Sequence, residues 1–595
     1  MAFRWAPLAA ALLLAGCLQA PDTTPTDPPA AAVGGFSHTA VFPGTYSTKA
    51  SAKVLQAGPY AIGGGEVTLL KSQLDGVDIE IGVVRPTVPD GVRVPVIADA
   101  SPYFSPLTPE NVKTQVLASL IVPDFVPHGY AYAGISVRGT AGSGGCMDLL
   151  GPLERADLAQ AVEWLGTQAW SNGNVGLFGI SYDGSTPWQA AAAGAPHLKT
   201  IVPMEGITDY FQLDYRNGTA NSFGLGTEFT GYYAQPFAFA PLDGRSPQHI
   251  QEAAGCPAMA QTAQAQLHAA VVGNHDALGF WAARDLRPLV LQNYNGSVFV
   301  VQGFHDDNVD PAQVTPFVNQ LEAKGVAVKQ LWGQWYHALA GSPGGANPNP
   351  RYDWHEMLLH WFDYWLKEDR TVDLGPRAEV QDALGQWRVE EGWPPRDAVP
   401  ARFELSGDGT LRNGTGATAG AMVVLPTVPQ GGRGSTLGDL WSDAATTCAK
   451  CAVFASEPMP REFRFAGLPT VGATVTPTGP GGYLAAHLFA QLPDGKRAQL
   501  GMGGGIDLRY ADGSPDPKPV LPGQKLLAKL ELEPMDAVVP AGARLVLVLD
   551  QGGYGSHLPP PDTFPVQVEL GGGQSVLAVK AFERGPDAFF TVPKK

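Results

Sequence analysis

The sequence predicts an α/β domain with a mostly parallel sheet and an inserted cap, followed by a β-sandwich. Three observations support this fold class. Apolar strand-like segments alternate with helical segments from about residue 65, and residues 207–290 interrupt the alternation with an aromatic- and glycine-rich stretch. After about residue 375, short alternating strands follow one another, with turns between them at intervals of about 8–12 residues.

The alternation in the first domain indicates parallel strands covered by helices. Continuous short apolar runs are typical of strands that are buried on both faces of a sheet. The interrupting segment predicts a cap, with a helix over 248–268. Strands are expected at 67–70, 77–84, 94–99, 130–137, 175–178, 200–203, 297–302 and 326–332, and helices at 153–169, 186–193, 311–324 and 354–366.

The second domain is expected to be a sandwich without internal repeats. Its strands are short, and helical periodicity is scarce after residue 375. Strands are expected at 380–381, 403–405, 484–492, 525–532, 544–549, 564–570 and 575–579. The predicted organisation is therefore a signal over 1–16, a tether and lead-in over 17–60, the α/β domain over 61–375 and the sandwich over 376–595.

Composition excludes two classes of protein. The 595 residues are 44% hydrophobic, which permits a sizeable core and excludes wholesale disorder. The chain has 39 Lys and Arg against 56 Asp and Glu, for a net charge of −17. An acidic chain without basic clusters is a poor binder of nucleic acid, and we expect no nucleic-acid partner.

The N-terminus has the pattern of an export signal. Arg4 precedes an apolar stretch that is too short to span a membrane. The stretch ends in Leu14-Ala15-Gly16-Cys17, which resembles the lipobox of bacterial lipoproteins. That resemblance implies cleavage before Cys17, lipidation of its sulfur and a lipid-anchored protein of the cell envelope, on its periplasmic or extracellular face. The alternative is an ordinary signal peptide, and a proline-rich tether over 18–33 follows in either case.

The other four cysteines fit an oxidising compartment. Cys448 and Cys451 are three positions apart, and we favour a local disulfide between them. A bond between Cys146 and Cys256 stays open. No second cysteine pair or Cys/His cluster at ligand spacing accompanies them, so no metal and no cofactor are expected.

A candidate nucleophile lies between a predicted strand and a predicted helix. The run Gly179-Ile-Ser181-Tyr-Asp183-Gly184 has the position and the small residues of a nucleophile elbow, whose tight turn projects a serine hydroxyl above the sheet. It departs from the plain Gly-x-Ser-x-Gly pattern, because position 183 is Asp and the second glycine comes at 184.

With Tyr182, this motif resembles that of the Xaa-Pro dipeptidyl-peptidase and cocaine-esterase-like family of α/β-hydrolases. Further runs, in the same order, resemble motifs of that family over about residues 60–595. The resemblance implies an α/β-hydrolase domain followed by a jelly-roll sandwich, and a serine hydrolase. The runs are Val137-Arg-Gly139, Ser143-Gly-Gly145, Ala169-Trp-Ser-Asn-Gly-Asn-Val175, Gly303-Phe-His-Asp306-Asp-Asn-Val309, Gly333-Gln-Trp-Tyr-His337, Gly385-Gln-Trp-Arg388 and Trp393-Pro-Pro395.

Elementary chemistry favours the same three residues. A serine hydroxyl is a weak nucleophile until a base takes its proton, and a carboxylate must orient that base. The chain order Ser181, Asp306, His337 is the one expected on this sheet, and Asp306 and His337 follow predicted strands. Asp307 and Asp310 compete with Asp306 for the role of acid, and His305 competes for the role of base.

An oxyanion hole requires two donors. The backbone N–H of Tyr182, the residue after the nucleophile, is one candidate. The resemblance implies a tyrosine hydroxyl as the other, and Tyr103 occupies the matching position after the third strand. The alternative for Tyr103 is a place in the core.

The peptidase branch must bind a free N-terminal ammonium and a proline ring, which calls for carboxylates and an aromatic pocket. Residues 204–218 resemble the segment after the serine in that branch. Glu205 and Glu228 are the candidates for the ammonium, although each is also compatible with a structural role. Candidate pocket walls are Trp188, Phe211 and Trp281.

The leading hypothesis is an exported Xaa-Pro dipeptidyl-peptidase that acts through an acyl-enzyme on Ser181, on a peptide or small acyl substrate. The alternative is an esterase or acylase with the same triad. A third class, an envelope-anchored binding protein with an inactive site, is disfavoured by the intact Ser, Asp and His. His355 and His360 are five positions apart and do not share a helix face, so that segment is interpreted as a packing helix.

Overall fold

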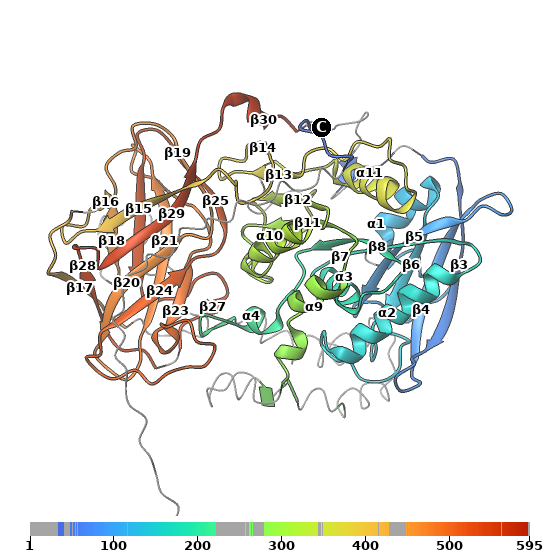
Figure 1. Cartoon of the computed structure of the whole chain (residues 1–595), viewed down its shortest axis with the longest axis horizontal. Helices are drawn as coiled ribbons and strands as arrows, with labels where there is room; N and C mark the ends of the chain where they lie inside the picture. The colour runs from blue at the N-terminus through green and yellow to red at the C-terminus, as the bar shows by residue number, and fades with distance from the viewer. Residues whose placement is uncertain are drawn as a thin grey trace, which may run out of the picture.

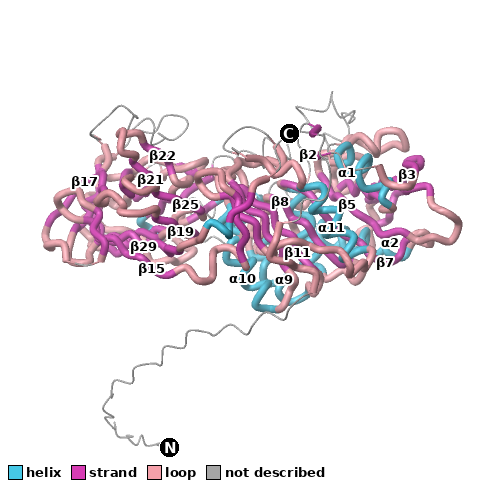
Figure 2. Tube along the Cα trace, turned by 90° about the horizontal axis from the view of Figure 1, so that it is seen from above, coloured by secondary structure: helices cyan, strands magenta, loops and turns pink. Residues whose placement is uncertain are grey.

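The computed structural model places two domains side by side along the long axis of the molecule (Figures 1 and 2). Cys17, Glu228 and most of the predicted cap lie outside the described residues. The structure describes residues 34–40, 48–49, 52–53, 55, 57–115, 117–221, 256, 261–262, 264–265, 279–342, 347, 349–414, 416–427, 448, 450–560 and 562–592.

The first domain is organised around one long twisted sheet, whose described part has 11 strands. Five pairings in its centre and the β12–β13 pairing are parallel, and the pairings at both ends are antiparallel. In spatial order the strands are β3 (Ala61–Lys71), β4 (Asp78–Thr87), β6 (Ala131–Ser136), β5 (Val94–Ser101), β7 (Ser171–Ile180), β8 (Leu198–Met204), β11 (Ser297–Gly303), β12 (Val328–Gly333), β13 (Ala378–Gln381), β14 (Trp387–Glu390) and β30 (Phe589–Phe590).

Two predictions about this sheet need correction. Residues 380–381 were assigned to the sandwich, but they belong to β13, which pairs in parallel with β12. The sheet therefore continues beyond residue 375, because β13 covers the edge that β12 would otherwise expose. The C-terminal strand β30 also returns to this sheet and pairs with β14.

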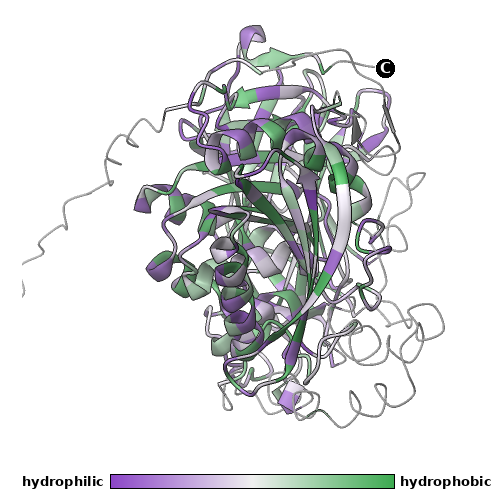
Figure 3. Ribbon diagram, turned by 90° about the vertical axis from the view of Figure 1, so that its right-hand side faces the viewer, coloured by the Kyte–Doolittle hydropathy of each residue, from purple (hydrophilic) through white to green (hydrophobic). Residues whose placement is uncertain are grey.

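Helices cover both faces of the sheet, and alternate residues of each strand meet different helices. On β11, Val298 and Val300 pack with one set of helices, whereas Phe299 and Val301 pack with the other. Figure 3 shows the resulting apolar strands between helices. One face carries α2 (Pro152–Thr167), α3 (Tyr182–Ala193), α9 (Arg287–Asn293) and α10 (Thr315–Lys324), and the other carries α1 (Ala118–Phe125) and α11 (Trp354–Leu366).

The C-terminal domain consists of two antiparallel sheets that share one apolar core, in agreement with the predicted sandwich. One sheet contains β15 (Val399–Leu405), β16 (Leu411–Asn413), β17 (Ala421–Leu425), β19 (Phe463–Gly467), β20 (Thr470–Pro477), β24 (Leu526–Glu531), β25 (Met535–Val539), β28 (Val566–Leu570) and β29 (Ser575–Phe582). The other contains β18 (Ala452–Ala455), β21 (Tyr483–Gln491), β22 (Arg497–Gln499), β23 (Gly504–Asp507) and β26 (Arg544–Asp550).

Backbone pairing and buried ion pairs join the two domains. A small sheet combines β9 (Tyr215–Arg216) and β10 (Thr219–Asn221) of the first domain with β27 (His557–Leu558) of the second. The buried guanidinium of Arg388, on β14, donates to the buried carboxylate of Asp536, on β25. The orientation of the domains is thus fixed by buried polar contacts as well as by strand pairing.

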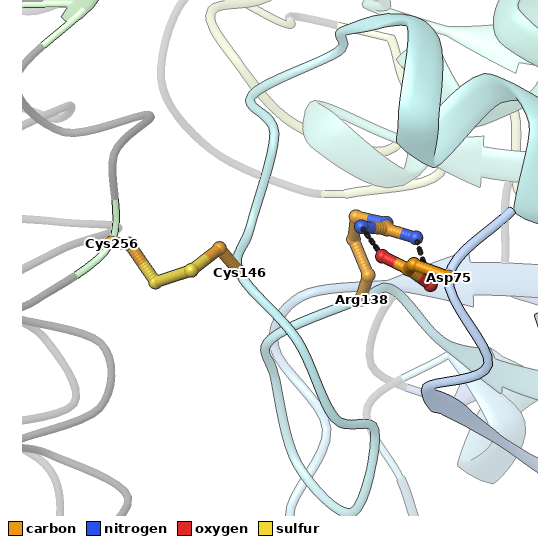
Figure 4. Close-up of a disulfide and its surroundings, with 4 residues drawn as sticks. All are labelled: Asp75, Arg138, Cys146 and Cys256. Carbon is orange, nitrogen blue, oxygen red and sulfur yellow. Dashed lines mark hydrogen bonds and ion pairs between the residues drawn. A yellow bond between two sulfur atoms is a disulfide. The ribbon is translucent and has the colours of Figure 1, made fainter.

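Two disulfides are present. The favoured bond between Cys448 and Cys451 is confirmed, and the open pairing of Cys146 with Cys256 is formed. The second bond attaches the predicted cap segment to the loop after β6 (Figure 4). In the same loop, the buried Arg138 donates to Asp75, 3.2 Å away (Figure 4). It also donates to Asp157 of α2, 2.7 Å away, so this loop is tied to the turn before β4 and to α2.

Among the described residues, no helix is long and apolar enough to cross a membrane.

Candidate active site

The candidate nucleophile lies at the junction of β7 and α3. Ser181 follows the last residue of β7 and directly precedes the first residue of α3. Its backbone has φ 68° and ψ −126°, a conformation that residues other than glycine rarely adopt. The N–H of Ser181 donates to the carbonyl of Met204 at 3.1 Å, at the end of the neighbouring strand β8. The serine is therefore held in a strained turn at the carboxyl end of the sheet.

The glycines around the serine are required by close backbone contacts. A Cβ on Gly179 would lie 2.3 Å from the carbonyl oxygen of Asp183, and one on Gly184 would lie 2.1 Å from that of Met204. Position 183 lacks such an obstruction and carries a buried side chain. This explains the departure from the plain motif, because the second glycine is needed where α3 passes β8.

Asp306 and His337 lie at the ends of the next two strands. Asp306 follows β11 and His337 follows β12, and the Nδ1 atom of His337 is 2.9 Å from Oδ2 of Asp306. The other carboxylate oxygen of Asp306 accepts hydrogen bonds from the backbone N–H groups of Asn308, at 3.0 Å, and Val309, at 2.9 Å. Asp306 is fully buried, so its orientation toward the imidazole is fixed.

The competing residues have other partners. Asp307 accepts a hydrogen bond from Ser556 at 3.2 Å, and Asp310 lies 3.2 Å from Nε2 of His557. The imidazole of His305 is hydrogen-bonded to Gln334 at 2.8 Å. The structure therefore joins Asp306, rather than either neighbouring carboxylate, to His337.

The carboxylates around His337 raise the pKa of its imidazole. Burial alone would lower the pKa of His337, but the charge and hydrogen bond of Asp306 outweigh burial, and Asp307 adds to them, so its pKa is raised. A base with a raised pKa binds the proton of the serine more strongly, and the carboxylate stabilises the imidazolium that forms.

Glu205 occupies a position that the prediction did not anticipate. It directly follows β8, between Ser181 and Asp306 in the order of strands, and only 1% of it is exposed. Its Oε1 atom accepts a hydrogen bond from Nε1 of Trp335 at 2.7 Å, and its Oε2 atom is 3.2 Å from Nδ1 of His337. The buried carboxyl thus contacts the Nδ1 side of the imidazole, a position that disfavours the predicted role of Glu205 as the receptor of a substrate ammonium.

The oxyanion-hole candidates lie on neighbouring strand ends. Tyr182 is the first residue of α3, where backbone N–H groups point out of the helix end. Its buried hydroxyl donates to Glu154 at 2.8 Å and accepts from the N–H of Leu150 at 3.0 Å, which fixes the start of the helix. Tyr103 lies two residues beyond β5, next to β7 in the sheet, and is 40% exposed. An exposed Tyr103 is not a core residue.

The predicted pocket walls fall into two groups. Trp188 packs inside the core against Phe317 of α10, with ring centroids 5.2 Å apart. Phe211 and Trp281 contact each other with centroids 5.5 Å apart. They belong to an aromatic cluster that also contains Tyr182, so this cluster borders the elbow.

Sequence reasoning missed a buried carboxyl pair below the elbow. Asp183, in the first turn of α3, and Asp99, on β5, are both buried. Burial raises the pKa of Asp99, and burial together with the charge of Asp99 raises that of Asp183. The departure at position 183 was the available signal, but the role of Asp99 depends on the pairing of β5 with β7.

A metal is a weaker interpretation of this site than a hydrogen-bonded triad. Glu205, Asp306 and His337 offer ligand atoms within 4.8 Å of one another. However, N–H donors already point at oxygens of both carboxylates. The histidines of the segment interpreted as a packing helix are separate, because His355 contacts Asp124 and His360 contacts the carbonyl of Asp373.

A strained serine at a strand–helix elbow, with a buried aspartate and a histidine on the following strand ends, defines a serine hydrolase of the α/β-hydrolase class. Residues 75–339 match the model of the X-Pro dipeptidyl-peptidase S15 family, and residues 370–570 match that of the X-Pro dipeptidyl-peptidase C-terminal non-catalytic domain. The chain therefore belongs to the Xaa-Pro dipeptidyl-peptidase and cocaine-esterase-like family of α/β-hydrolases.

Relatives occur in both branches of this family. A protein of Streptomyces avermitilis with the provisional name Xaa-Pro dipeptidyl-peptidase is 27% identical in an alignment of 603 positions. The alignment covers 86% of this chain and 83% of that protein. The cocaine esterase of a Rhodococcus species is 28% identical over 385 residues, which cover 58% of this chain and 62% of that one.

Solved structures agree on the fold. An aminopeptidase from a marine-sediment Thaumarchaeota archaeon superposes with a TM-score of 0.68 at 18% identity, covering 91% of this chain and 98% of that one. An alpha-amino acid ester hydrolase superposes with the same TM-score and identity, covering 90% of this chain and 98% of that one. At this level of identity the likeness concerns the fold alone.

Proposed function

We propose that this chain is an exported Xaa-Pro dipeptidyl-peptidase that releases N-terminal dipeptides through an acyl-enzyme on Ser181. The observation that carries the proposal is the hydrogen bond between Asp306 and His337, at strand ends of the same sheet whose strand β7 leads into the elbow of Ser181, in a chain whose two domains both match X-Pro dipeptidyl-peptidase models. The Streptomyces avermitilis relative also covers 86% of the chain and the cocaine esterase 58%, although a mycobacterial relative named as a serine esterase covers 81%.

The mechanism follows from the arrangement of the three residues. Nε2 of His337 takes the hydroxyl proton of Ser181 as the serine oxygen attacks the carbonyl carbon of the proline residue. At the same time, Asp306 accepts the hydrogen bond from Nδ1–H of His337. The N–H of Tyr182 and the hydroxyl of Tyr103 would donate to the oxyanion. The imidazolium then protonates the departing amine, and water activated by His337 hydrolyses the acyl-enzyme.

A substrate pair tests the branch. A dipeptidyl-peptidase has to recognise the charged amine two residues from the scissile bond, so we expect cleavage of Ala-Pro anilide and not of N-acetyl-Ala-Pro anilide. The discrimination should reach about 100-fold, because acetylation leaves an enzyme carboxylate without its partner. Glu228 is the remaining predicted carboxylate, and Glu228→Gln should shrink the ratio by slowing cleavage of the free amine.

The esterase alternative predicts the opposite substrate preference. The cocaine esterase relative is the observation in its favour. Equal rates on the free and acetylated anilides, or strong turnover of short-chain esters alone, would assign this protein to that branch. Ser181→Ala serves as the control, since it has to eliminate whichever activity is found.

We also propose that the mature protein is attached to the cell envelope by lipid on Cys17. The support is the Leu-Ala-Gly-Cys run before a proline-rich segment. Mass spectrometry of the mature N-terminus should show an acylated cysteine, and Cys17→Ala should release the protein from membranes. An unmodified N-terminus produced by cleavage elsewhere would contradict the proposal.

A further inference from the structure

The backbone at Glu205 is held in an uncommon conformation. Its φ is 49°, in the left-handed region, although it carries a long side chain. Its N–H donates to the carbonyl of Val301 on β11 at 3.0 Å. Strained residues of this kind persist where the surrounding structure fixes them, and they concentrate at functional sites. This backbone conformation places the side chain of Glu205 beside His337, where the parallel strands end.

The carboxyl of Glu205 meets the same ring atom as the triad acid. Nδ1 of His337 lies 2.9 Å from Oδ2 of Asp306 and 3.2 Å from Oε2 of Glu205. The other oxygen of Glu205 accepts from the indole N–H of Trp335, two residues before His337. The side chain therefore contacts both the imidazole and the loop that carries it.

We propose that Glu205 is a positioning residue of this site: it fixes the Nδ1 side of His337 jointly with Asp306, and it can accept the Nδ1 proton when Asp306 cannot. The inference rests on the triad of the proposed function and is independent of whether the substrate is a peptide or an ester. It replaces the predicted role of Glu205 as a receptor for the substrate amine.

The charges of the site favour the protonated form of the Glu205 carboxyl while Asp306 is ionised. Two adjacent carboxylates in a buried site repel each other, so both do not ionise readily. Burial and the charge of Asp306 raise the pKa of Glu205 well above its usual range, against the opposing effect of hydrogen bonds from Trp335, Ala338 and Gly303. Burial and the charge of Asp306 thus favour the neutral form of Glu205, while Asp306 accepts two backbone N–H hydrogen bonds of its own.

Replacing Asp306 by asparagine removes the neighbouring charge, so Glu205 should ionise more readily. Without the neighbouring charge its pKa falls, and the ionised carboxyl can accept Nδ1–H and preserve the active tautomer. The remaining charge that acts on His337 is that of Asp307, which follows Asp306 directly in the chain and is unchanged in this variant. Residual activity of Asp306→Asn should thus rise with pH as Glu205 loses its proton.

The test compares Asp306→Asn with the double variant Asp306→Asn/Glu205→Gln. The readouts are the rate of Ser181 labelling by a fluorophosphonate and the turnover of p-nitrophenyl acetate, between about pH 6 and pH 9. Glutamine carries no charge, and its one acceptor oxygen cannot serve both Trp335 and His337. The double variant should be about tenfold or more slower than Asp306→Asn, and it should keep only the rise with pH that comes from deprotonation of His337, without the further rise that comes from Glu205. Equal rates at every pH would overturn the proposal.

Single variants separate positioning from stability. Glu205→Gln alone should lower kcat about tenfold and change KM less than about twofold, because the ring and not the substrate site is disturbed. Glu205→Asp in the Asp306→Asn background retains a carboxyl, so it should restore the rise with pH that Glu205→Gln removes. Loss of the rise in both double variants, each with native circular dichroism, would count against the proposal.

A matched control excludes a general effect of removing a buried glutamate. Glu322→Gln changes a buried glutamate of α10 that pairs with Arg396 and Gln330. It should leave the pH profile unchanged. The probe labels the serine whatever the substrate, so a protein that labels normally but does not cleave Ala-Pro anilide would contradict the proposed peptidase function and leave the role of Glu205 intact.

Discussion

The two domains use buried charge differently. In the first domain, Glu205, Asp306 and His337 follow the ends of three neighbouring strands, β8, β11 and β12, and these side chains face one another. In the second domain, the shared core between the sheets is apolar, while its buried Asp536 and Glu533 pair with Arg388 and Arg216 of the first domain. At these sites, buried charge serves chemistry at the ends of the parallel strands and attachment at the face of the sandwich.

This difference has a topological cause. Adjacent parallel strands bring equivalent ends to the same edge, so polar residues from distant parts of the chain converge there. In an antiparallel sandwich, neighbouring strands run in opposite directions and alternate side chains fill the space between the sheets. We expect substitutions at the strand ends to affect turnover and substitutions at the junction to affect stability.

The largest effect is expected for Ser181→Ala. Removal of the nucleophile should lower kcat by about 10⁴- to 10⁶-fold, because acylation cannot occur. The thermal unfolding temperature should stay the same or rise, since alanine loses only a partly exposed hydroxyl. Turnover and differential scanning calorimetry on one preparation check both expectations, and wild-type turnover would place the site elsewhere.

Asp306→Asn should lower kcat by about 10⁴-fold at low pH, where Glu205 is protonated and an asparagine favours the wrong imidazole tautomer, and by less at higher pH, where Glu205 can accept Nδ1–H. Asp307→Asn should cost much less, since Asp307 contacts Ser556 and not the imidazole. Steady-state kinetics of the two variants, side by side, decide between the adjacent carboxylates. The reverse ranking would mean that the acid has been misplaced by one residue.

At the junction between the two domains, we expect a substitution to change stability rather than turnover. Arg388→Ala leaves the fully buried Asp536 without its ion pair, and such a loss destabilises a protein by about 3–5 kcal/mol. The midpoint of guanidinium unfolding should fall, while kcat per folded molecule stays near wild type. Arg85→Ala, which breaks an exposed pair with Glu66, is the matched control and should change stability by about 1 kcal/mol or less. A comparable loss in both variants would contradict the comparison.

The smallest expected effect is a change in pH dependence. Because the pKa of His337 is raised, kcat/KM should fall as the pH drops through that raised value and His337 becomes protonated. Asp307 contributes to the rise in the pKa of His337, so Asp307→Asn should move the acidic limb to lower pH. A limb that does not move, measured at constant ionic strength, would show that Asp307 is screened by solvent.

Local patterns were sufficient for much of the fold. The helix predicted over 354–366 has those bounds in α11, and the predicted strands at 297–302 and 326–332 coincide closely with β11 and β12. The helix expected at 186–193 begins earlier, at Tyr182, because the elbow leads directly into it. The helices α1 and α9 were not predicted, since each is short and begins beside residues without a periodic apolar pattern.

The sequence by itself determined the order of the domains, the elbow at Ser181 and the motifs that contain Asp306 and His337, because each of these depends on residues close together in the chain. Only the tertiary structure decided that Asp306 rather than Asp307 faces the imidazole, that Cys146 bonds to Cys256, and that Glu205 lies behind His337. These contacts depend on which strands are neighbours and how far each strand extends, and neither is encoded in local spacing. A shift of one residue along β8 would direct the carboxyl of Glu205 to the opposite face of the sheet.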